Sequence, residues 1–172
     1  MCIRDRCEDT LFTTGISKFP ITAINIHTKE ILYAPKFDLP EHKKSASTPG
    51  ICYSFPNAYL VFHSLDYEKE IKETQRLLSI DVNTGKIVFD TPLSISENRK
   101  DYTGHGLTYA KGYVWHLREN LLTKMDSKNG KILKTYYIEN AKKCTSLFYY
   151  KESLWVTNFN GGVYQILSLI HI

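Results

Sequence analysis

The chain has 172 residues, of which 42% are apolar and 13% aromatic, enough to build a globular core. Its formal net charge is only +4 and the basic residues are spread along the sequence, so nothing favours a nucleic-acid partner. The sequence has no apolar run of the roughly twenty residues that span a membrane, and its many tyrosines and phenylalanines favour strands.

Both ends of the chain look foreign. Met1–Arg6 can be encoded by a DNA string whose reverse complement, read in frame, encodes Leu167–Ile172. That string resembles a transposase end sequence used to tag DNA for sequencing. We therefore expect residues 1–6 and 167–172 to be non-native, and residues 7–166 to be an internal fragment of a longer protein. On this expectation the localisation stays open.

The predicted elements, in chain order, are short strands joined by turns. The segment 7–36 supplies a partial unit, with its third and fourth strands within 21–32. A linker at 35–49 leads into a complete unit at 46–93. Its strands are predicted at 51–54, 58–63, 76–80 and 86–90, with a charged insertion at 64–76 between the second and the third.

A second complete unit is predicted at 103–138, after a linker at 92–103. Its strands are expected at 106–109, 113–117, 121–125 and 131–138, joined by short turns. A linker at 139–143 precedes a last, partial unit at 143–166, in which Trp155 aligns with Trp115. Four consecutive antiparallel strands with short connections make one meander sheet.

One turn recurs in the frame of these units. Asp81–Lys86 and Asp126–Lys131 share the pattern Asp-x-x-x-Gly-Lys, and Asn25–Glu30 is a diverged copy. An Asp or Asn side chain that opens a turn accepts hydrogen bonds from backbone N–H groups two or three residues on. Glycine suits a position with positive φ, so Lys29 in the first copy predicts a turn that is strained or differently shaped.

Two aliphatic residues follow each turn: Ile31-Leu32, Ile87-Val88 and Ile132-Leu133. They put an apolar residue on both faces of the outgoing strand, so we expect each sheet to be covered on both faces. Sheets stacked around an axis provide such cover, whereas a two-layer sandwich covers one face. The sandwich alternative would hold if Trp115 and Trp155 did not occupy equivalent positions in adjacent sheets.

The recurring turn, with Gly-Leu-x-Tyr-x-x-Gly-x-Val-Trp upstream, resembles β-propellers of the quinoprotein-like and YVTN-like (WD40-like) superfamily. The resemblance implies an all-β, partial β-propeller of four-stranded antiparallel meander blades, with about three blades and no closure. The residues that carry the structural repeat are Asp81, Gly85, Lys86, Asp126, Gly130, Lys131, Trp115 and Trp155.

Quinone-binding members of that superfamily carry the docking pattern Ala-x-Asp-x-x-x-Gly-Lys-x-x-Trp. Here Ser79 and Phe89 replace its Ala and Trp, and Lys124 and Lys134 replace them in the second copy. The docking role is structural in that family, so no cofactor is predicted.

The resemblance also implies where a ligand would bind. Propeller sites gather on the face that bears the loops between the second and third strands and the connections between units. That face would present 64–76, 97–105 and 118–120 to a protein or a small molecule. The candidate ligand-binding residues are His105, Arg118, Asn158, Asn160 and Lys143.

Each candidate also has a structural interpretation. His105 lies between two glycines at the entry to a first strand, where it could contact a ligand or bond to a neighbouring unit. Trp115 and Trp155 could stack on a ligand, but equivalent positions favour packing between sheets. His116 is expected to be partly solvated.

No residue set predicts a metal site or a disulfide. His27, His42 and His63 show no ligand spacing. Cys52 and Cys144 form no C-x-x-C motif, and they are interpreted as buried apolar residues, which leaves the redox compartment open.

The sequence contains no nucleophile elbow, Gly-rich phosphate loop or Ser-x-x-Lys motif. We expect a ligand- or protein-binding β-propeller fragment without catalysis of its own. The alternative is part of a propeller enzyme, because Gly104–Thr108 resembles a segment of glutamine cyclotransferases. A quinone-dependent dehydrogenase is a further enzyme type in this class.

Overall fold

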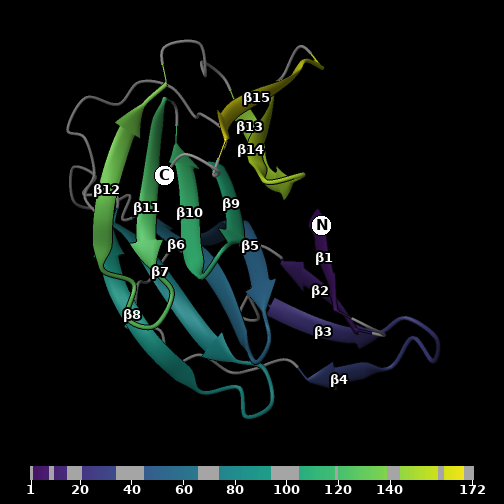
Figure 1. Cartoon of the computed structure of the whole chain (residues 1–172). Coiled ribbons are helices and arrows are strands. Elements are labelled where there is room, and N and C mark those ends of the chain that lie inside the picture. Colours follow the sequence, from purple (N-terminus) through teal and green to yellow (C-terminus); the bar gives the residue numbers. More distant parts are fainter. Residues whose placement is uncertain are drawn as a thin grey trace. The chain divides into compact units, whose positions relative to one another are not determined.

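The computed structural model describes residues 2–7, 10–14, 21–33, 45–65, 74–93, 105–118, 120–138, 144–158 and 161–168. In these ranges all regular structure is β, from strand β1 to strand β15. The strands form two compact units, Met1–Ile95 and Ser96–Ile172 (Figure 1). No sheet closes on itself within the described part, so the predicted all-β, open architecture is confirmed.

The first unit holds two four-stranded antiparallel sheets, each a meander in sequence order. The first contains β1 (Cys2–Cys7), β2 (Thr10–Thr14), β3 (Ile21–Asn25) and β4 (Ile31–Tyr33). The second contains β5 (Ser45–Ser54), β6 (Asn57–Leu65), β7 (Thr74–Asp81) and β8 (Ile87–Leu93). Strand β1 uses residues that we expect to be non-native. Strand pairing uses backbone groups, so it cannot tell native residues from foreign ones. The foreign origin of residues 1–6 therefore stays a prediction.

The second unit holds one four-stranded and one three-stranded sheet, both antiparallel meanders. The first contains β9 (His105–Ala110), β10 (Tyr113–Arg118), β11 (Leu121–Asp126) and β12 (Ile132–Tyr137). The second contains β13 (Cys144–Tyr150), β14 (Ser153–Asn158) and β15 (Val163–Ser168).

Several strands are longer than expected. Strand β5 begins at Ser45, inside the predicted linker 35–49, and β8 runs on to Leu93, inside the predicted linker 92–103. Strands β6 and β7 reach into both ends of the predicted insertion at 64–76, whose middle lies outside the described residues. The linker at 139–143 also lies outside them.

The recurring turn has the same hydrogen bonds in all three copies. The backbone N–H of Asn25, Asp81 and Asp126 donates to the carbonyl five residues on, at 2.9 Å each. The opening side chain accepts from backbone N–H groups at 2.7–3.0 Å. Lys29 has φ 62°, close to Gly85 at 70° and Gly130 at 71°. The Lys29 turn therefore has the common shape, and the expected strain lies in its left-handed backbone.

The docking pattern also recurs at one register. The third and fourth strands of each four-stranded sheet pair Ala23 with Tyr33, Ser79 with Phe89, and Lys124 with Lys134. An irregularity in register follows each of these pairs at the next residue of the third strand. Such a bulge increases local twist, so the three sheets enter their turns alike.

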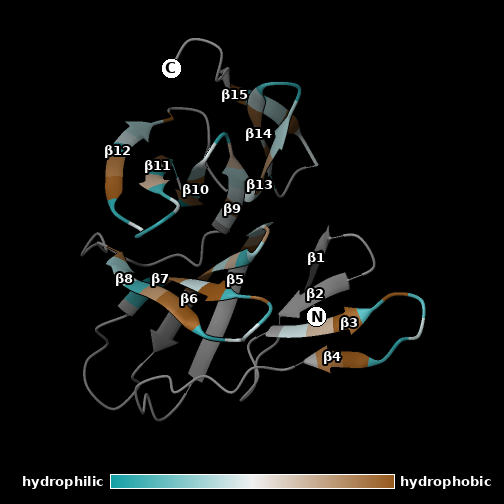
Figure 2. Ribbon diagram, turned by 60° about the horizontal axis from the view of Figure 1, so that its bottom comes forward, coloured by the Kyte–Doolittle hydropathy of each residue, from teal (hydrophilic) through white to brown (hydrophobic). Residues whose placement is uncertain are grey.

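The core lies in the central strands. Consecutive residues are buried in β6 (Ala58–Val61), β7 (Leu77–Ile80) and β10 (Val114–Arg118), so both faces of these strands are covered. The aliphatic pairs of the outer strands differ from the expectation. Ile31 is 66% exposed, and its five counterparts are 39–52% exposed. The brown segments of β4 and β12 in Figure 2 mark such pairs. The expectation that both faces are covered is therefore confirmed for the inner strands. It is wrong for the aliphatic pairs of the outer strands.

Candidate functional site

The candidate site lies at one end of the second unit, where β9 begins and β10 ends. The pairing of these two strands places His105 directly opposite Arg118. The neighbouring sheet contributes Cys144 and Asn158, which are paired at the start of β13 and the end of β14. We call the ends formed by His105, Arg118, Cys144 and Asn158 the strand-end surface.

A close backbone contact aligns the two sheets. A Cβ built on Gly106 would lie 2.4 Å from Leu147 Cβ and 2.5 Å from Leu147 N, so only glycine fits there. Strand β9 therefore runs against β13, and both start at the same end. Glycine beside His105 is explained by this contact with the neighbouring sheet, and no ligand is needed to account for it.

Arg118 is the charged group that the strand-end surface buries. It is only 8% exposed, although it is the last residue of its strand. A guanidinium stays charged at any ordinary pH and presents five donors in a planar fork. Its burial therefore encloses a charged donor group at the end of β10. The side chain of His105 lies outside the described residues, as do Lys143 and Asn160.

Asn158 shapes the loop between β14 and β15. Its Oδ1 accepts from Gly162 N at 2.9 Å, and its Nδ2 donates to the Tyr164 hydroxyl at 3.4 Å. The backbone closes the same loop, since Gly161 N donates to Asn158 O at 3.1 Å. The amide therefore has a structural role here.

The two tryptophans occupy equivalent positions in neighbouring sheets. Trp115 Nε1 donates to Ala110 O at 3.4 Å and Trp155 Nε1 donates to Tyr150 O at 3.0 Å, each spanning its own hairpin. Trp115 belongs to the core cluster that joins the two sheets, together with Leu117, Leu147 and Val156. This equivalence argues against the sandwich alternative.

His116 corrects an expectation. We expected a partly solvated side chain, but it is only 5% exposed. The alternating pattern of a half-buried strand does not apply to β10, because both of its faces are covered. His116 is therefore a core histidine.

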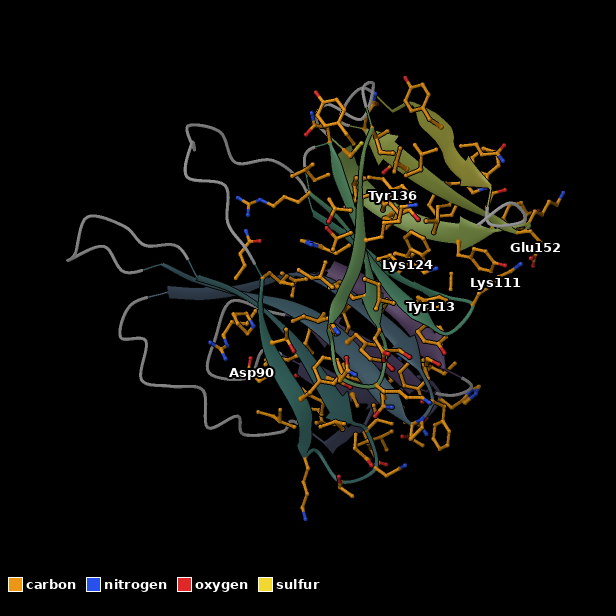
Figure 3. All side chains as sticks on the ribbon, turned by 60° about the vertical axis from the view of Figure 1, so that its left-hand side comes forward. Asp90, Lys111, Tyr113, Lys124, Tyr136 and Glu152 are labelled. Atoms are coloured by element: carbon orange, nitrogen blue, oxygen red, sulfur yellow. The ribbon has the colours of Figure 1, made fainter. Side chains whose placement is uncertain are left out.

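A second cluster, at the opposite end of the unit, was not singled out from the sequence. Lys111 forms an ion pair with Glu152, and the Tyr149 hydroxyl donates to the same carboxylate at 2.7 Å. The three residues, which we call the turn clasp, link the β9–β10 turn to the β13–β14 hairpin. Figure 3 labels Lys111 and Glu152 of this cluster. The available signal in the sequence was that Lys111 and Lys151 occupy matching positions in the turns of the two aligned units.

The contacts within the turn clasp shift the pKa values of its three residues. Hydrogen bonds from Lys111 and Tyr149 lower the pKa of Glu152, and the bond to Glu152 raises the pKa of Lys111 and of Tyr149. All three groups are solvent-accessible, so water screens the charges. The clasp is a surface contact between two turns.

The lysines that replace the docking pair rest on aromatic rings. Lys124 Nζ lies 3.8 Å from the centre of the Tyr113 ring, and Lys134 Nζ lies 4.8 Å from that of Tyr136. Trp115 stacks on Tyr136 at 6.2 Å between ring centres. Figure 3 shows Tyr113, Lys124 and Tyr136 on one sheet. Each of these lysines therefore covers aromatic rings of its own sheet.

Cys52 and Cys144 are free and buried, as expected, and burial raises the pKa of the Cys144 thiol. Within the described ranges, no three His, Cys, Asp or Glu side chains are grouped so that they could hold a metal ion. In the same ranges, no helix has the length and apolarity to cross a membrane.

Four-stranded meander sheets with a repeated turn and equivalent tryptophans define an open part of a β-propeller. The comparison with solved structures supports the same fold. Glutaminyl cyclase from Myxococcus xanthus matches with a TM-score of 0.60 at 11% identity, over 92% of this chain and 62% of that chain. BamB from Moraxella catarrhalis matches with a TM-score of 0.56 at 10% identity, over 92% of this chain and 40% of that chain. Both are β-propeller proteins.

The computationally designed Ika4 protein matches with a TM-score of 0.56 at 13% identity, over 93% of this chain and 86% of that chain. At these identities the likeness concerns the fold alone. This chain spans 62% of the cyclase and 40% of BamB, which is less than two thirds of each. No protein-family model and no curated protein matches the chain.

Proposed function

We propose that this chain is part of a quinoprotein-like, YVTN-like β-propeller that binds a ligand or a protein segment and has no catalysis of its own. The superfamily placement is supported by three turns closed by the same backbone hydrogen bonds and by the recurring register of the docking pair. No quinone is part of this proposal, because the docking role of these positions is structural in that family.

The binding site we propose is the strand-end surface, and Arg118 is the observation that carries it. A charged side chain at the end of a strand normally reaches into water, yet Arg118 is buried beside the start of the neighbouring strand. A buried guanidinium suits an anionic group, and its planar fork favours a carboxylate. We propose as the partner a small molecule or a peptide whose carboxylate would add to the contacts that Arg118 already makes within the chain.

Titration with glycyl-glutamate, followed by amide chemical shifts, tests the site. We expect shifts at Gly106, Arg118 and Asn158, and at least tenfold weaker binding in Arg118→Gln. Arg118→Lys, which keeps the charge but loses the fork, should bind with intermediate affinity. Arg76→Gln is the matched control, since Arg76 pairs with Asp90 at 2.6 Å in the other unit. Unchanged binding in Arg118→Gln, with the fold retained, would remove the proposal.

The second candidate is an enzyme of the glutamine cyclotransferase type. It is favoured by the segment around His105 and by the shared fold with glutaminyl cyclase. A peptide with an N-terminal glutamine separates the two functions, because cyclisation releases ammonia and changes the mass of the peptide. The binding proposal expects the mass to stay constant. Turnover that depends on His105, measured with His105→Ala, would favour the enzyme.

A further inference from the structure

Strand β12 is the outer strand of its sheet, and among the described residues only β11 pairs with it. Its side chains are unusually open. Ile132, Leu133 and Tyr137 are 39%, 47% and 64% exposed, and Lys134 and Thr135 are exposed as well. An exposed, apolar edge strand is a template for pairing with another strand.

Strand β8, the fourth strand of another four-stranded sheet, is also an edge strand, and it is protected. Strand β8 carries Asp90 and Pro92, and charge and proline are the usual means of blunting an edge. Strand β12 has neither a proline nor an acidic residue, and its only charge is Lys134. Its sequence is otherwise aliphatic, β-branched and aromatic, which suits a paired strand.

The direction of its free backbone groups follows from its pairing with β11. Ile138 N donates to Asn120 O at 2.7 Å, so residues 134, 136 and 138 direct their N–H and C=O groups towards β11. Residues 135 and 137 therefore direct theirs outward, whereas the irregularity in register at Leu133 ends the regular alternation. Thr135 and Tyr137 are the residues that a new strand would meet.

We propose that β12 pairs antiparallel with β12 of a second copy of this chain, with Thr135 opposite Thr135. A two-fold axis normal to the joined sheet must pass between a residue and its own symmetry mate. At the middle of β12 that residue is either Lys134 or Thr135. Like charges placed opposite each other are destabilising, so the Lys134 register is disfavoured.

The Thr135 register places unlike side chains opposite each other on both sides of its centre. It places Leu133 opposite Tyr137 and Lys134 opposite Tyr136. Aliphatic–aromatic and Thr–Thr pairs stabilise antiparallel sheets, and Lys134 already lies over the Tyr136 ring of its own chain. This self-complementarity favours a second copy as the occupant. A six-residue strand makes a small interface, so we expect a weak, concentration-dependent dimer.

Sedimentation over a range of concentrations, combined with disulfide trapping, tests the register. The chain used carries Cys2→Ser and Cys7→Ser, because Cys52 and Cys144 are buried. Thr135→Cys should give a disulfide-linked dimer, since opposed Cα atoms in a hydrogen-bonded pair lie about 5.5 Å apart. Lys134→Cys should not, because the two Cα atoms would be roughly 8 Å apart. A linked dimer from Lys134→Cys alone, or from neither variant, overturns the proposal.

A proline tests the strand edge. Thr135→Pro removes an N–H that points outward and so leaves the β11–β12 ladder intact. We expect it to abolish the dimer while the far-ultraviolet spectrum and melting temperature stay near those of the parent chain. Leu133→Lys, a second variant, should weaken dimerisation at least tenfold. A parent chain that is monomeric at every concentration overturns the proposal, as does a dimer that survives Thr135→Pro, including one formed through β15.

Discussion

Lys29 shows how a single residue stores strain in a repeated structure. It holds the left-handed position that glycine fills in the other two turns, and the turn has the same hydrogen bonds in each. A side chain with a Cβ is disfavoured there by roughly 1–2 kcal/mol. The surrounding ladder, not the preference of Lys29, therefore determines the shape of this turn.

Lys29→Gly should stabilise the first unit by about 1 kcal/mol, because it removes that strain. Urea unfolding followed by circular dichroism measures the change. Gly130→Ala, the matched reverse substitution, should destabilise by a similar amount. An unchanged or lower stability in Lys29→Gly would contradict the explanation.

Ser79 is a second residue that does not suit its surroundings, because it is a polar residue at a buried position. It is fully buried opposite Phe89, and its hydroxyl has no hydrogen-bond partner. The equivalent position in the first sheet holds Ala23, which is also fully buried. A buried hydroxyl without a partner loses its bonds to water and gains nothing in return.

We expect Ser79→Ala to raise the free energy of unfolding by about 1 kcal/mol. Chemical denaturation gives the value. Ser54→Ala, at the partly exposed end of β5, is the control and should change stability by less than about 0.5 kcal/mol. A loss of stability in Ser79→Ala would mean that the hydroxyl has a partner.

At the scale of elements, the turn clasp connects hairpins that belong to different sheets. The carboxylate of Glu152 is held by Lys111 and Tyr149, which lowers its pKa. A group whose pKa is lowered by folding stabilises the protein above its ordinary value of 4.5, and this contribution is lost as the pH falls through the lowered pKa. The raised pKa values of Lys111 and Tyr149 act in the opposite sense, so their contribution is lost above pH 10.

Glu152→Gln should therefore lower the melting temperature at pH 7, and the difference from the parent chain should shrink as the pH falls below 4.5. Melting curves across this range test it. Lys111→Met should behave in the same way, and the double variant should add little. A difference that stays undiminished down to pH 3 would show that Glu152 acts through packing.

The sequence predicted the strands and turns better than it predicted which of their side chains are buried. Strand order and the recurring turn were readable, because both depend on local chemistry such as the side chain of Asp81 or the φ of Gly85. Burial was harder to infer. Arg118 and His116 lie on a strand that is covered on both faces, whereas Ile31 and Leu32 lie on an outer strand. Which strand is central depends on tertiary packing, and an isolated pattern does not contain it.

At the scale of the whole molecule, Cys52 and Cys144 provide one buried thiol in each of the two units, so their reactivity can be used to compare the units. Cys52 lies in β5 of the first unit and Cys144 in β13 of the second, and both are at most 3% exposed. A thiol reagent reaches such a side chain only when its surroundings open. Labelling therefore measures local opening of each unit.

With Cys2 and Cys7 replaced by serine, we expect both remaining thiols to react at least a hundred times more slowly than in denaturant, as roughly 3 kcal/mol of local stability would require. Leu60→Ala should speed the labelling of Cys52, and Leu117→Ala that of Cys144, because both leucines are fully buried. Peptide mass mapping identifies the labelled site. Fast labelling of the parent chain would contradict the burial.

The meander order of the sheets has a consequence for how the chain folds. Every strand in the described sheets pairs only with its sequence neighbours, so each pairing closes a short stretch of chain. Proteins rich in distant pairings fold slowly, because loop closure precedes the stabilising contacts. This all-β chain avoids much of that delay within each sheet. Its slow step would then be the docking of one finished sheet on the next, at contacts such as Gly106 against Leu147.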